Sequence, residues 1–448
     1  MMAGTGKHHG GKHHGGERNG TVAYVNARLI DPASGLDEPG ALVTSGGVIA
    51  DLGPRLFSDA PPPSVDVVDC RGLILAPGLV DMRTQLREPG EEHKETIGTA
   101  SAAAGAGGVS TMVCLPNTDP VIDDVAGVEF VARRAREAKA TKVFCYAAAT
   151  VGMAGRELTE MGLLAETGAL AFTDGTRAIA NSRVMQRALN YARTFGLLIV
   201  QHPEDPALAE NGVMNGGEMA LRLGLRGIPR VAEVMTIERD LRLVEATGGR
   251  YHAAHLSTRE AVEAIRRAKA RELPVTCDTA PPYFTLNETA IGDYRTFAKL
   301  SPPLRTEEDR DAIVEGLADG TVDAIASDHA PHDQDSKRVP FAQAEDGIVG
   351  LETLLPLSLA LVHKGRLGMA DLLGKLTAGP AAILGLGEGR LRKGAPADLV
   401  LIDPDKPWRI DPDAFLSKSK NAPWENLPVQ GVAMRTVVEG RVLHDRMT

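Results

Sequence analysis

The sequence has few of the features that mark a disulfide scaffold, a membrane protein or a secreted protein. It contains 4 cysteines in 448 residues, none of them in CxxC spacing, so it carries neither a disulfide framework nor a thiolate metal site. No apolar run reaches the roughly 18 residues that a membrane-spanning helix needs, so we expect no membrane partner. The N-terminus lacks the apolar core of a signal peptide. We therefore expect the protein in the cytoplasm, a compartment that keeps cysteines reduced.

An excess of positive charge is also missing. The chain has 49 Lys and Arg against 59 Asp and Glu, a formal net charge of −10, whereas proteins that bind nucleic acid usually carry a basic surface. We expect no nucleic-acid partner. Glycine (48) and proline (28) are plentiful but not periodic, which excludes a collagen-like chain. Hydrophobic residues make up 43% of the chain, enough for a large core in two or three domains or in one barrel with insertions.

The two ends of the chain differ in texture from its middle. Residues 1–20 are rich in glycine and histidine and predict a disordered tail, although their histidines could also bind a metal ion. Residues 21–75 and 389–448 contain short apolar segments broken by Gly, Pro and Asp, as β-strands do. Because chain termini commonly lie close together, we expect one small β-sandwich domain built from both ends.

Residues 76–388 alternate candidate strands with Ala-, Arg- and Glu-rich helical stretches. We count eight such strands, at 78–83, 109–114, 142–146, 169–174, 197–202, 251–255, 274–278 and 323–328. This pattern predicts an α/β fold, a TIM-like (β/α)8 barrel with its functional groups at the C-terminal strand ends. An open doubly wound sheet is the alternative, but the glycine-rich phosphate turn expected after its first strand is absent.

Polar side chains stand at the ends of four of these strands. Asp174, His202, His255 and Asp328 end the fourth, fifth, sixth and eighth strands. Imidazole and carboxylate groups are the usual ligands of zinc in hydrolytic sites. The pattern favours a metal-type site over a buried polar network, which stays open as the alternative.

From Thr21 onward the chain resembles the dihydroorotases (class I type) of the amidohydrolase superfamily. The matching segments include LAPGLVDM, LREPGEEHKETI, LPNTDPV, AFTDG, QHPED, HAAHLS, SDHAPH and KGAPADLVLIDPD. The resemblance implies a (β/α)8 barrel with a β-sandwich made from both ends, a homo-oligomer and a zinc-dependent hydrolase. It also implies a small-molecule substrate, because the family catalyses the reversible cyclisation of N-carbamoyl-L-aspartate to L-dihydroorotate in pyrimidine biosynthesis.

The resemblance also implies roles for the residues at the strand ends. Asp174 is similar to a zinc-bridging carboxylate, and His202 and His255 to ligands of the second metal position. Asp328 resembles the ligand that also shuttles a proton between metal-bound water and the substrate amide, which makes it the catalytic residue.

A second group resembles the family's binding residues for the substrate carboxylate. Arg87 and Asn117 match the pair that holds this carboxylate, helped by His332 and by the backbone near Gly347. A planar guanidinium such as that of Arg87 suits bidentate carboxylate binding.

The first strand departs from the family pattern. The family's His-x-His-x-Arg, which supplies two ligands of the first zinc, here runs from Arg83 through Gln85 to Arg87. Arginine cannot be deprotonated and repels a metal cation, so we expect at most one zinc per chain, at His202 and His255. Ser301 and the segment APPYF (280–284) also stand where active members commonly carry other residues.

We interpret Arg83 as a metal surrogate. Its charge, placed between Asp174 and Asp328, would offset part of the repulsion between two close carboxylates. In the alternative interpretation, Arg83 points elsewhere and the carboxylates hold water.

Three functions compete on this evidence. The first is a dihydroorotase with a damaged first metal site. The second is a non-catalytic dihydroorotase-like subunit that stabilises aspartate transcarbamoylase. The third is another cyclic amide hydrolase, of the hydantoinase or allantoinase type, which is weakened because residues 172–175 lack the expected lysine.

Overall fold

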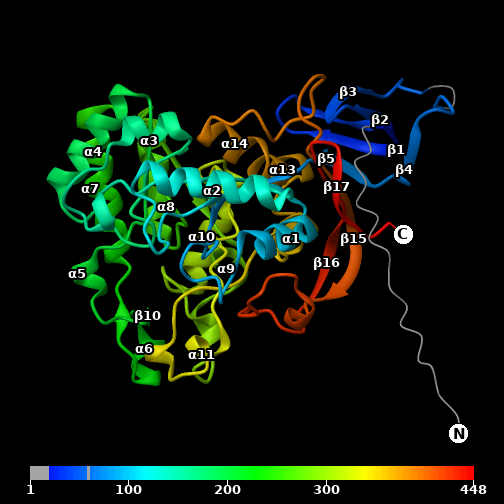
Figure 1. Cartoon of the computed structure of the whole chain (residues 1–448). Helices are drawn as coiled ribbons and strands as arrows, with labels where there is room; N and C mark the ends of the chain where they lie inside the picture. The colour runs from blue at the N-terminus through cyan, green and yellow to red at the C-terminus, as the bar shows by residue number, and fades with distance from the viewer. Residues whose placement is uncertain (1–19, 58–60, 448) are drawn as a thin grey trace, which may run out of the picture.

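The computed structural model describes residues 20–57 and 61–447 (Figure 1). The disordered tail predicted over residues 1–20 lies outside these ranges, apart from Gly20. Within them, no helix is both long enough and apolar enough to cross a membrane.

A closed barrel of parallel strands forms the larger part of the molecule. One run pairs β6 (Leu79–Thr84), β7 (Val109–Cys114) and β8 (Lys142–Cys145), and the other pairs β9 (Leu198–Gln201), β12 (Arg250–Ala253), β13 (Val275–Thr279) and β14 (Ala324–Ile325). Parallel bridges from Phe172 to Ala147 and Ile199 join the runs on one side, and Thr84 with His329 joins them on the other. The (β/α)8 barrel is thereby confirmed, with the segment around Phe172 as its fourth strand.

Helices surround the barrel and cover the outer face of its strands (Figure 1). The longer ones are α1 (Ile97–Gly107), α2 (Val125–Ala138), α3 (Met161–Thr167), α4 (Ser182–Thr194), α7 (Val231–Thr247), α8 (Arg259–Ala270), α10 (Glu307–Ala318), α12 (Leu354–His363), α13 (Met369–Leu376) and α14 (Ala378–Leu384). Short elements in the loops are α5 (Pro206–Ala209), α6 (Glu218–Leu223), α9 (Pro281–Thr285) and α11 (Gln334–Lys337), the two-residue strands β10 (Met214–Asn215) and β11 (Gly227–Ile228), and five 3₁₀ turns at Val151–Met153, Glu288–Ile291, Thr296–Ala298, Phe341–Gln343 and Pro412–Ala414.

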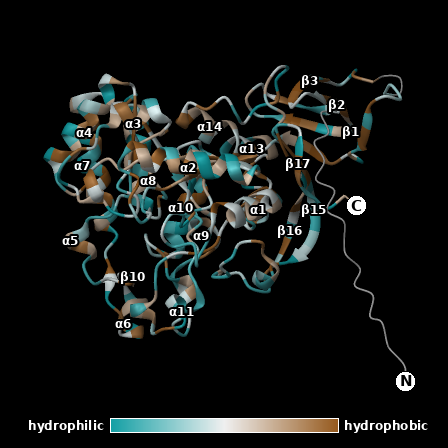
Figure 2. Cartoon of the chain, in the orientation of Figure 1, coloured by the Kyte–Doolittle hydropathy of each residue, from teal (hydrophilic) through white to brown (hydrophobic). Residues whose placement is uncertain are grey.

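Local sequence explains where the helices begin and which face they bury. Thr96 and Thr306 form capping boxes that start α1 and α10, because their hydroxyls bind otherwise unpaired N–H groups of the first turn. In α4 the buried residues recur at helical spacing, from Val184 and Ala188 to Ala192, while the opposite face is exposed. Figure 2 accordingly shows both hydrophobic and hydrophilic colours along α4 and α8.

Strands from both ends of the chain form a second, eight-stranded sheet. Its order is β17 (Arg441–Asp445), β16 (Pro428–Val438), β15 (Leu399–Arg409), β5 (Ile74–Pro77), β1 (Val22–Asp31), β2 (Leu36–Ser45) and β3 (Val48–Gly53), with β4 (Asp66–Asp69) beside β1. The junction of the two ends is the antiparallel pairing of β5 with β15, visible in Figure 1 where blue strands meet orange and red ones. Tyr24 and Leu29 share one core with Leu399 and Val437, so neither end can complete this core alone.

The connection between β15 and β16, residues 410–427, leaves this sheet and runs toward the barrel (Figure 1). We call it the strap. Main-chain N–H groups of Leu416 and Ser417 donate to Glu352 Oε1 of the barrel at 2.8 and 3.1 Å. The Ser419 hydroxyl donates to the Lys94 carbonyl oxygen at 2.7 Å. The smaller sheet is therefore tied to the loops at the barrel mouth.

Candidate functional site

Three of the residues singled out from the sequence have unusual backbone geometry. Arg87, His255 and Asp328 adopt φ values of 61°, 39° and 50°, in the left-handed region that non-glycine residues seldom occupy. Such conformations cost about 1–3 kcal/mol each and cluster at functional sites. The backbone at these strand ends is thus held in a shape that the local sequence disfavours.

Arg83 and Asp328 form a buried ion pair across the barrel mouth. Arg83 Nε donates to Asp328 Oδ1 at 2.9 Å, and the two side chains are only 3% and 9% exposed. Burial raises the pKa of Asp328, and the Arg83 guanidinium opposes that rise. Arg83 Nη1 is buried without a hydrogen-bond partner. The charge of this carboxylate is therefore balanced by a side chain of the protein itself.

His202 and His255 contact each other. His202 Nδ1 lies 3.1 Å from His255 Nε2, and the rings stack with their centroids 4.9 Å apart. One of these two nitrogens must carry the shared proton, and a protonated ring nitrogen has no lone pair for a metal. Burial, followed by the charge of Arg83, holds the pKa of His255 well below its usual range. The far nitrogen of this ring, Nδ1, is buried and unpartnered.

Asp174 is held by Thr150. The Thr150 N–H donates to Asp174 Oδ1 at 2.9 Å, and its hydroxyl donates to Oδ2 at 2.6 Å. Burial raises the pKa of Asp174, and these two bonds oppose the rise. The side-chain hydrogen bond of Arg83 goes to Asp328 and its main-chain N–H donates to Asp81, so its interpretation as a surrogate between Asp174 and Asp328 stays a prediction.

These residues do not fit a two-zinc centre. Across residues 20–57 and 61–447, no group of three or more His, Cys, Asp or Glu side chains is arranged to hold a metal ion. At the first position, Arg83 is a cation, and Gln85 Oε1 already accepts from Asn117 Nδ2 at 3.0 Å.

The predicted carboxylate-binding residues do come together. Arg87 Nε donates to the Pro331 carbonyl oxygen at 3.1 Å, and Arg87 Nη2 lies 3.0 Å from His332 Nε2. Arg87 Nη1 donates to Glu91 at 3.0 Å. Two of the five guanidinium N–H groups remain for a ligand.

His332 presents a neutral ring to this guanidinium. Burial, followed by the nearby positive charge of Arg87, lowers the pKa of His332 to about 2. The Asp346 carbonyl oxygen also lies 2.9 Å from Nε2, so the tautomer decides which of the two contacts is a hydrogen bond. His332 Nδ1 is buried without a partner, which leaves a polar atom for a ligand to meet.

Gly347 lies directly against the segment that carries His332. Its φ is +133°, and a Cβ at this position would come within 2.6 Å of the Ala330 Cβ. Asn117 approaches from the other side, since a Cβ on Gly175 would lie 3.2 Å from the Asn117 Cβ. The structure thus brings Gly347 to His332, and Asn117 to Gln85 and the loop after Asp174.

The sequence reasoning missed buried polar residues that organise these loops. Glu95 accepts a hydrogen bond from Ser417 of the strap at 2.5 Å and lies 3.5 Å from His329. Burial raises the pKa of Glu95, but His329 and the hydroxyls of Ser417 and Thr99 outweigh it and lower the pKa overall. Asn421 of the strap was missed as well. A glutamate inside the family-like segment LREPGEEHKETI was the available signal for Glu95, whereas the strap offers no periodic pattern.

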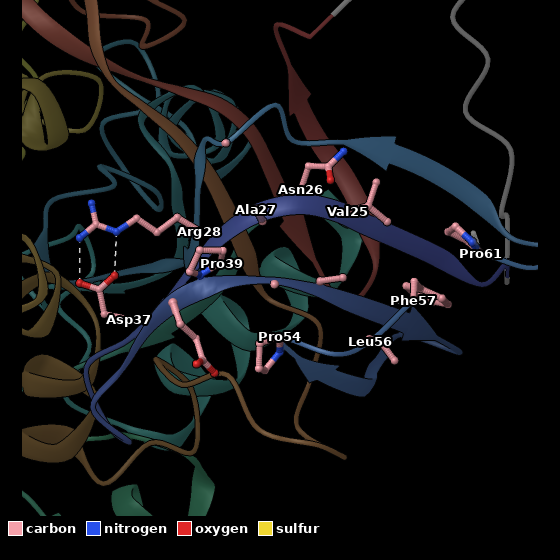
Figure 3. Close-up of a pocket in the computed structure, with 14 residues that line it drawn as sticks. Val25, Asn26, Ala27, Arg28, Asp37, Pro39, Pro54, Leu56, Phe57 and Pro61 are labelled. Carbon is pink, nitrogen blue, oxygen red and sulfur yellow. Dashed lines mark hydrogen bonds and ion pairs between the residues drawn. The ribbon is translucent and has the colours of Figure 1, made fainter. Parts of the chain in front are cut away.

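A large pocket lies elsewhere. It measures about 980 Å³, is bordered by β1, β2 and residues 54–57, and contains none of the predicted site residues (Figure 3). The Arg28–Asp37 ion pair spans one end of it, with Nε and Oδ1 2.7 Å apart. Size alone does not identify the site of chemistry here.

Comparison with known proteins gives two family matches along the chain. A family described as dihydro-orotase-like matches residues 72–261, and a further amidohydrolase family matches residues 358–444. Among curated proteins, a dihydroorotase of Pelobacter propionicus is 48% identical over 421 residues, which are 94% of this chain and 99% of that protein. A dihydroorotase of Anaplasma phagocytophilum is 46% identical over 427 residues, 95% of each chain.

Solved structures share the fold. An L-hydantoinase from Arthrobacter aurescens superposes with a TM-score of 0.84 at 24% identity, covering 95% of this chain and 96% of that one. A dihydropyrimidinase from Brevibacillus agri superposes with a TM-score of 0.81 at 20% identity, covering 95% of each. At these identities the likeness shows the fold alone.

Proposed function

Because this chain belongs to the dihydroorotase family of amidohydrolases, we propose that its barrel mouth binds N-carbamoyl-L-aspartate and L-dihydroorotate and interconverts them slowly. Its place is then in pyrimidine biosynthesis, in the cytoplasm, where four buried free cysteines stay reduced. The observation that carries the proposal is the buried Arg83–Asp328 ion pair, which lies beside a complete set of carboxylate-binding candidates.

Binding rests on charge and on preorganised hydrogen-bond donors. Arg87 is 7% exposed and is oriented by Pro331 and His332, so its remaining N–H groups suit a carboxylate. The unpartnered Nδ1 of His332 and the amide group of Asn117 offer further polar contacts. A small ligand with one or two carboxylates complements this arrangement.

We expect catalysis to be slow because Asp328 is already paired with Arg83. The family is generally zinc-dependent, and zinc supplies an activated water when bound. Here we propose at most one zinc per chain, at His202 and His255, since the first position lacks nitrogen ligands. Burial raises the pKa of Asp328, but the adjacent Arg83 cation favours the ionised form, so this carboxylate is a weaker proton acceptor than the same buried group would be without Arg83.

The direct test compares this protein with the Pelobacter propionicus dihydroorotase under identical conditions. After removal of residues 1–19, whose histidines could bind metal themselves, we expect no more than one zinc by elemental analysis. L-Dihydroorotate should bind in titration calorimetry, with turnover at least about two orders of magnitude below that of the relative, since each 1.36 kcal/mol of barrier is tenfold. Equal turnover, or two zincs per chain, would contradict the damaged-site proposal.

Restoring the family ligands is the matched variant. The double substitution Arg83→His with Gln85→His should raise both zinc content and turnover. Gln85→His alone serves as the control, because it keeps the Arg83–Asp328 pair and should therefore not raise turnover. An equal gain from the single substitution would show that the ion pair is not what limits the reaction.

The same ion pair supports a second candidate, a non-catalytic subunit that stabilises aspartate transcarbamoylase. This alternative predicts no turnover at all and a complex with the transcarbamoylase on size-exclusion chromatography. The chromatogram of the protein alone also tests the proposed homo-oligomer. A hydantoinase-type activity is disfavoured, because residues 172–175 contain no lysine, and hydantoin as substrate is the control.

A further inference from the structure

Asn421 of the strap uses every polar atom of its side-chain amide. Its Nδ2 donates to the Ala330 carbonyl oxygen at 3.1 Å and to the Gly347 carbonyl oxygen at 3.0 Å. Its Oδ1 accepts from the His332 N–H at 3.1 Å. The residue is 2% exposed, so these bonds are not shared with bulk water.

The three partners of this amide lie on two loops of the barrel mouth. Ala330 and His332 follow β14, and Gly347 lies in the later loop that returns to the same place. The Asn421 carbonyl oxygen also accepts from the Val349 N–H at 3.1 Å. Asn421 of the strap thus bonds to both loops, which are also joined directly by the Ala330 N–H, a donor to the Ile348 carbonyl oxygen at 2.6 Å.

The position of these loops bears directly on Arg87. Its guanidinium contacts the Pro331 carbonyl oxygen and the His332 ring, both on the segment that Asn421 holds. The fit is close, as the absence of room for a Cβ at Gly347 demonstrates. A shift of the 330–332 segment would therefore turn the guanidinium away from its present direction.

We propose that Asn421 is a positioning residue that sets the geometry of the carboxylate-binding candidates Arg87, His332 and Gly347. This inference rests on the proposed function, since it concerns how the same ligand is held. It also gives the eight-stranded sheet built from both chain ends a part in the site, because the strap connects two strands of that sheet.

The amide group is required by the chemistry of its partners. Two carbonyl oxygens need two N–H donors, and one N–H needs an acceptor, a combination that asparagine offers in this size. An aspartate of the same shape has no donor and would place a carboxylate against two carbonyl oxygens. Asn421→Asp is therefore the sharpest change, and Asn421→Ala removes the amide without adding charge.

The first experiment measures affinity for L-dihydroorotate by titration calorimetry in the full chain. For Asn421→Asp and Asn421→Ala we expect the dissociation constant to rise on the order of 10- to 100-fold, as the loss of a hydrogen bond between a charged group and its ligand can cause. Ser419→Ala, on the same strap but bonded to Lys94, is the matched control and should leave the affinity unchanged. Unchanged affinity in both Asn421 variants would overturn the inference.

A double-variant cycle separates positioning from general loosening. If Asn421 acts through Arg87, then Arg87→Ala and Arg87→Ala with Asn421→Ala should bind equally weakly, because coupled residues are not additive. Independent losses that multiply would overturn the inference. If Asn421→Ala does not fold, Asn421→Ser, which keeps one donor, takes its place in the cycle.

A measurement without ligand distinguishes this inference from the proposed function. Amide hydrogen exchange should speed up at His332 and Val349 in the Asn421 variants and stay unchanged in Ser419→Ala. If wild type binds no L-dihydroorotate, the proposed function fails, and faster exchange would still support Asn421 as the residue that holds these loops. Unchanged exchange at both amides would overturn that role as well.

Discussion

The barrel mouth has two halves that differ in what their arginines contact. We call them the metal half and the carboxylate half. The metal half comprises Arg83, Asp174, His202, His255 and Asp328, and the carboxylate half comprises Arg87, Asn117, His332, Gly347 and Asn421. In the metal half both carboxylates are paired internally, Asp328 with the Arg83 guanidinium and Asp174 with the Thr150 hydroxyl, while Arg83 Nη1 and His255 Nδ1 stay without a hydrogen-bond partner.

The carboxylate half leaves polar atoms of Arg87 and His332 for a ligand. His332 Nδ1 is buried without a partner, and Arg87 retains N–H groups that no protein atom uses. A carboxylate that is paired with a protein cation is less free to exchange a proton, whereas N–H groups without a protein partner can bind a ligand. The difference teaches that recognition and catalysis can be separated within one barrel mouth, and the following changes test that separation.

The largest expected effect is on stability in the metal half. Arg83→Ala would leave Asp328 buried without its partner, and breaking a buried ion pair typically costs about 3–5 kcal/mol. The midpoint of urea unfolding at neutral pH measures it. Adding Asp328→Ala to Arg83→Ala should recover part of the loss, since no charge is then left unpaired. An unchanged midpoint in Arg83→Ala would mean that the pair contributes nothing, and the contrast between the halves would weaken.

The next effect is pH-dependent and concerns the strap that serves the carboxylate half. Burial raises the pKa of Glu352 from 4.5 to about 7. The unfolded chain releases this proton earlier than the folded one, so the contribution is complete below pH 4.5 and is lost as the pH rises toward 7. The loss is at most about 3 kcal/mol.

Glu352→Gln should remove this dependence. Between pH 5 and pH 8, the urea midpoint of wild type should fall relative to that of Glu352→Gln. Glu425→Gln, an exposed residue of the same strap, should follow wild type. Parallel pH profiles for wild type and Glu352→Gln would contradict the assignment.

A smaller effect is expected on ligand affinity. Arg87→Ala should weaken L-dihydroorotate binding by about 2 kcal/mol, roughly 30-fold, the usual contribution of hydrogen bonds to a charged group. Arg87→Lys keeps the positive charge but not the planar guanidinium that binds a carboxylate with two N–H groups. Its affinity for L-dihydroorotate should therefore lie between those of wild type and Arg87→Ala. Calorimetric titration measures both. Equal affinities of Arg87→Ala and wild type would remove the basis for naming a carboxylate half.

The smallest effect is expected at Asp174. Thr150→Val removes the hydroxyl that donates to Oδ2 while keeping the side-chain shape and the main-chain bond. We expect a loss of about 1–2 kcal/mol in unfolding free energy, with Thr150→Ser close to wild type. A loss as large as that of Arg83→Ala would indicate that Asp174 belongs to the same charge network as Asp328.

Much of the fold follows from local sequence. The segment 109–114 forms β7 over the predicted residues, because a run of buried apolar and β-branched residues suits a strand covered on both faces. The segment 169–174 is different. Phe172 forms its bridges, and most of its other main-chain hydrogen bonds go to residues 145–149, where the chain leaves β8 for the irregular loop that holds Thr150. Strand identity is a local property, but strand length depends on this loop.

The arrangement of the site was less accessible. That Arg83 faces Asp328 depends on which way a long side chain turns inside the barrel, and residue spacing does not specify that direction. Asn421 lies 91 positions from Ala330, in a segment without periodicity, so no pattern connects the two. The role of Asn421 becomes apparent only in the folded structure, where the loops that carry Ala330 and Gly347 both contact its side chain.

The pairing of β5 with β15 has a consequence for the order of events during synthesis. β5 ends at Pro77 and β15 begins at Leu399, and chains grow at about 5–20 residues per second, so the early strands wait on the order of tens of seconds for their partners. During that time the edge of β5 is open to other strands. Asn421 follows β15 in the chain, so the bonds that it makes to the two loops form only after residue 421 has been synthesised. Completion of the ligand site in this way follows synthesis of the strap.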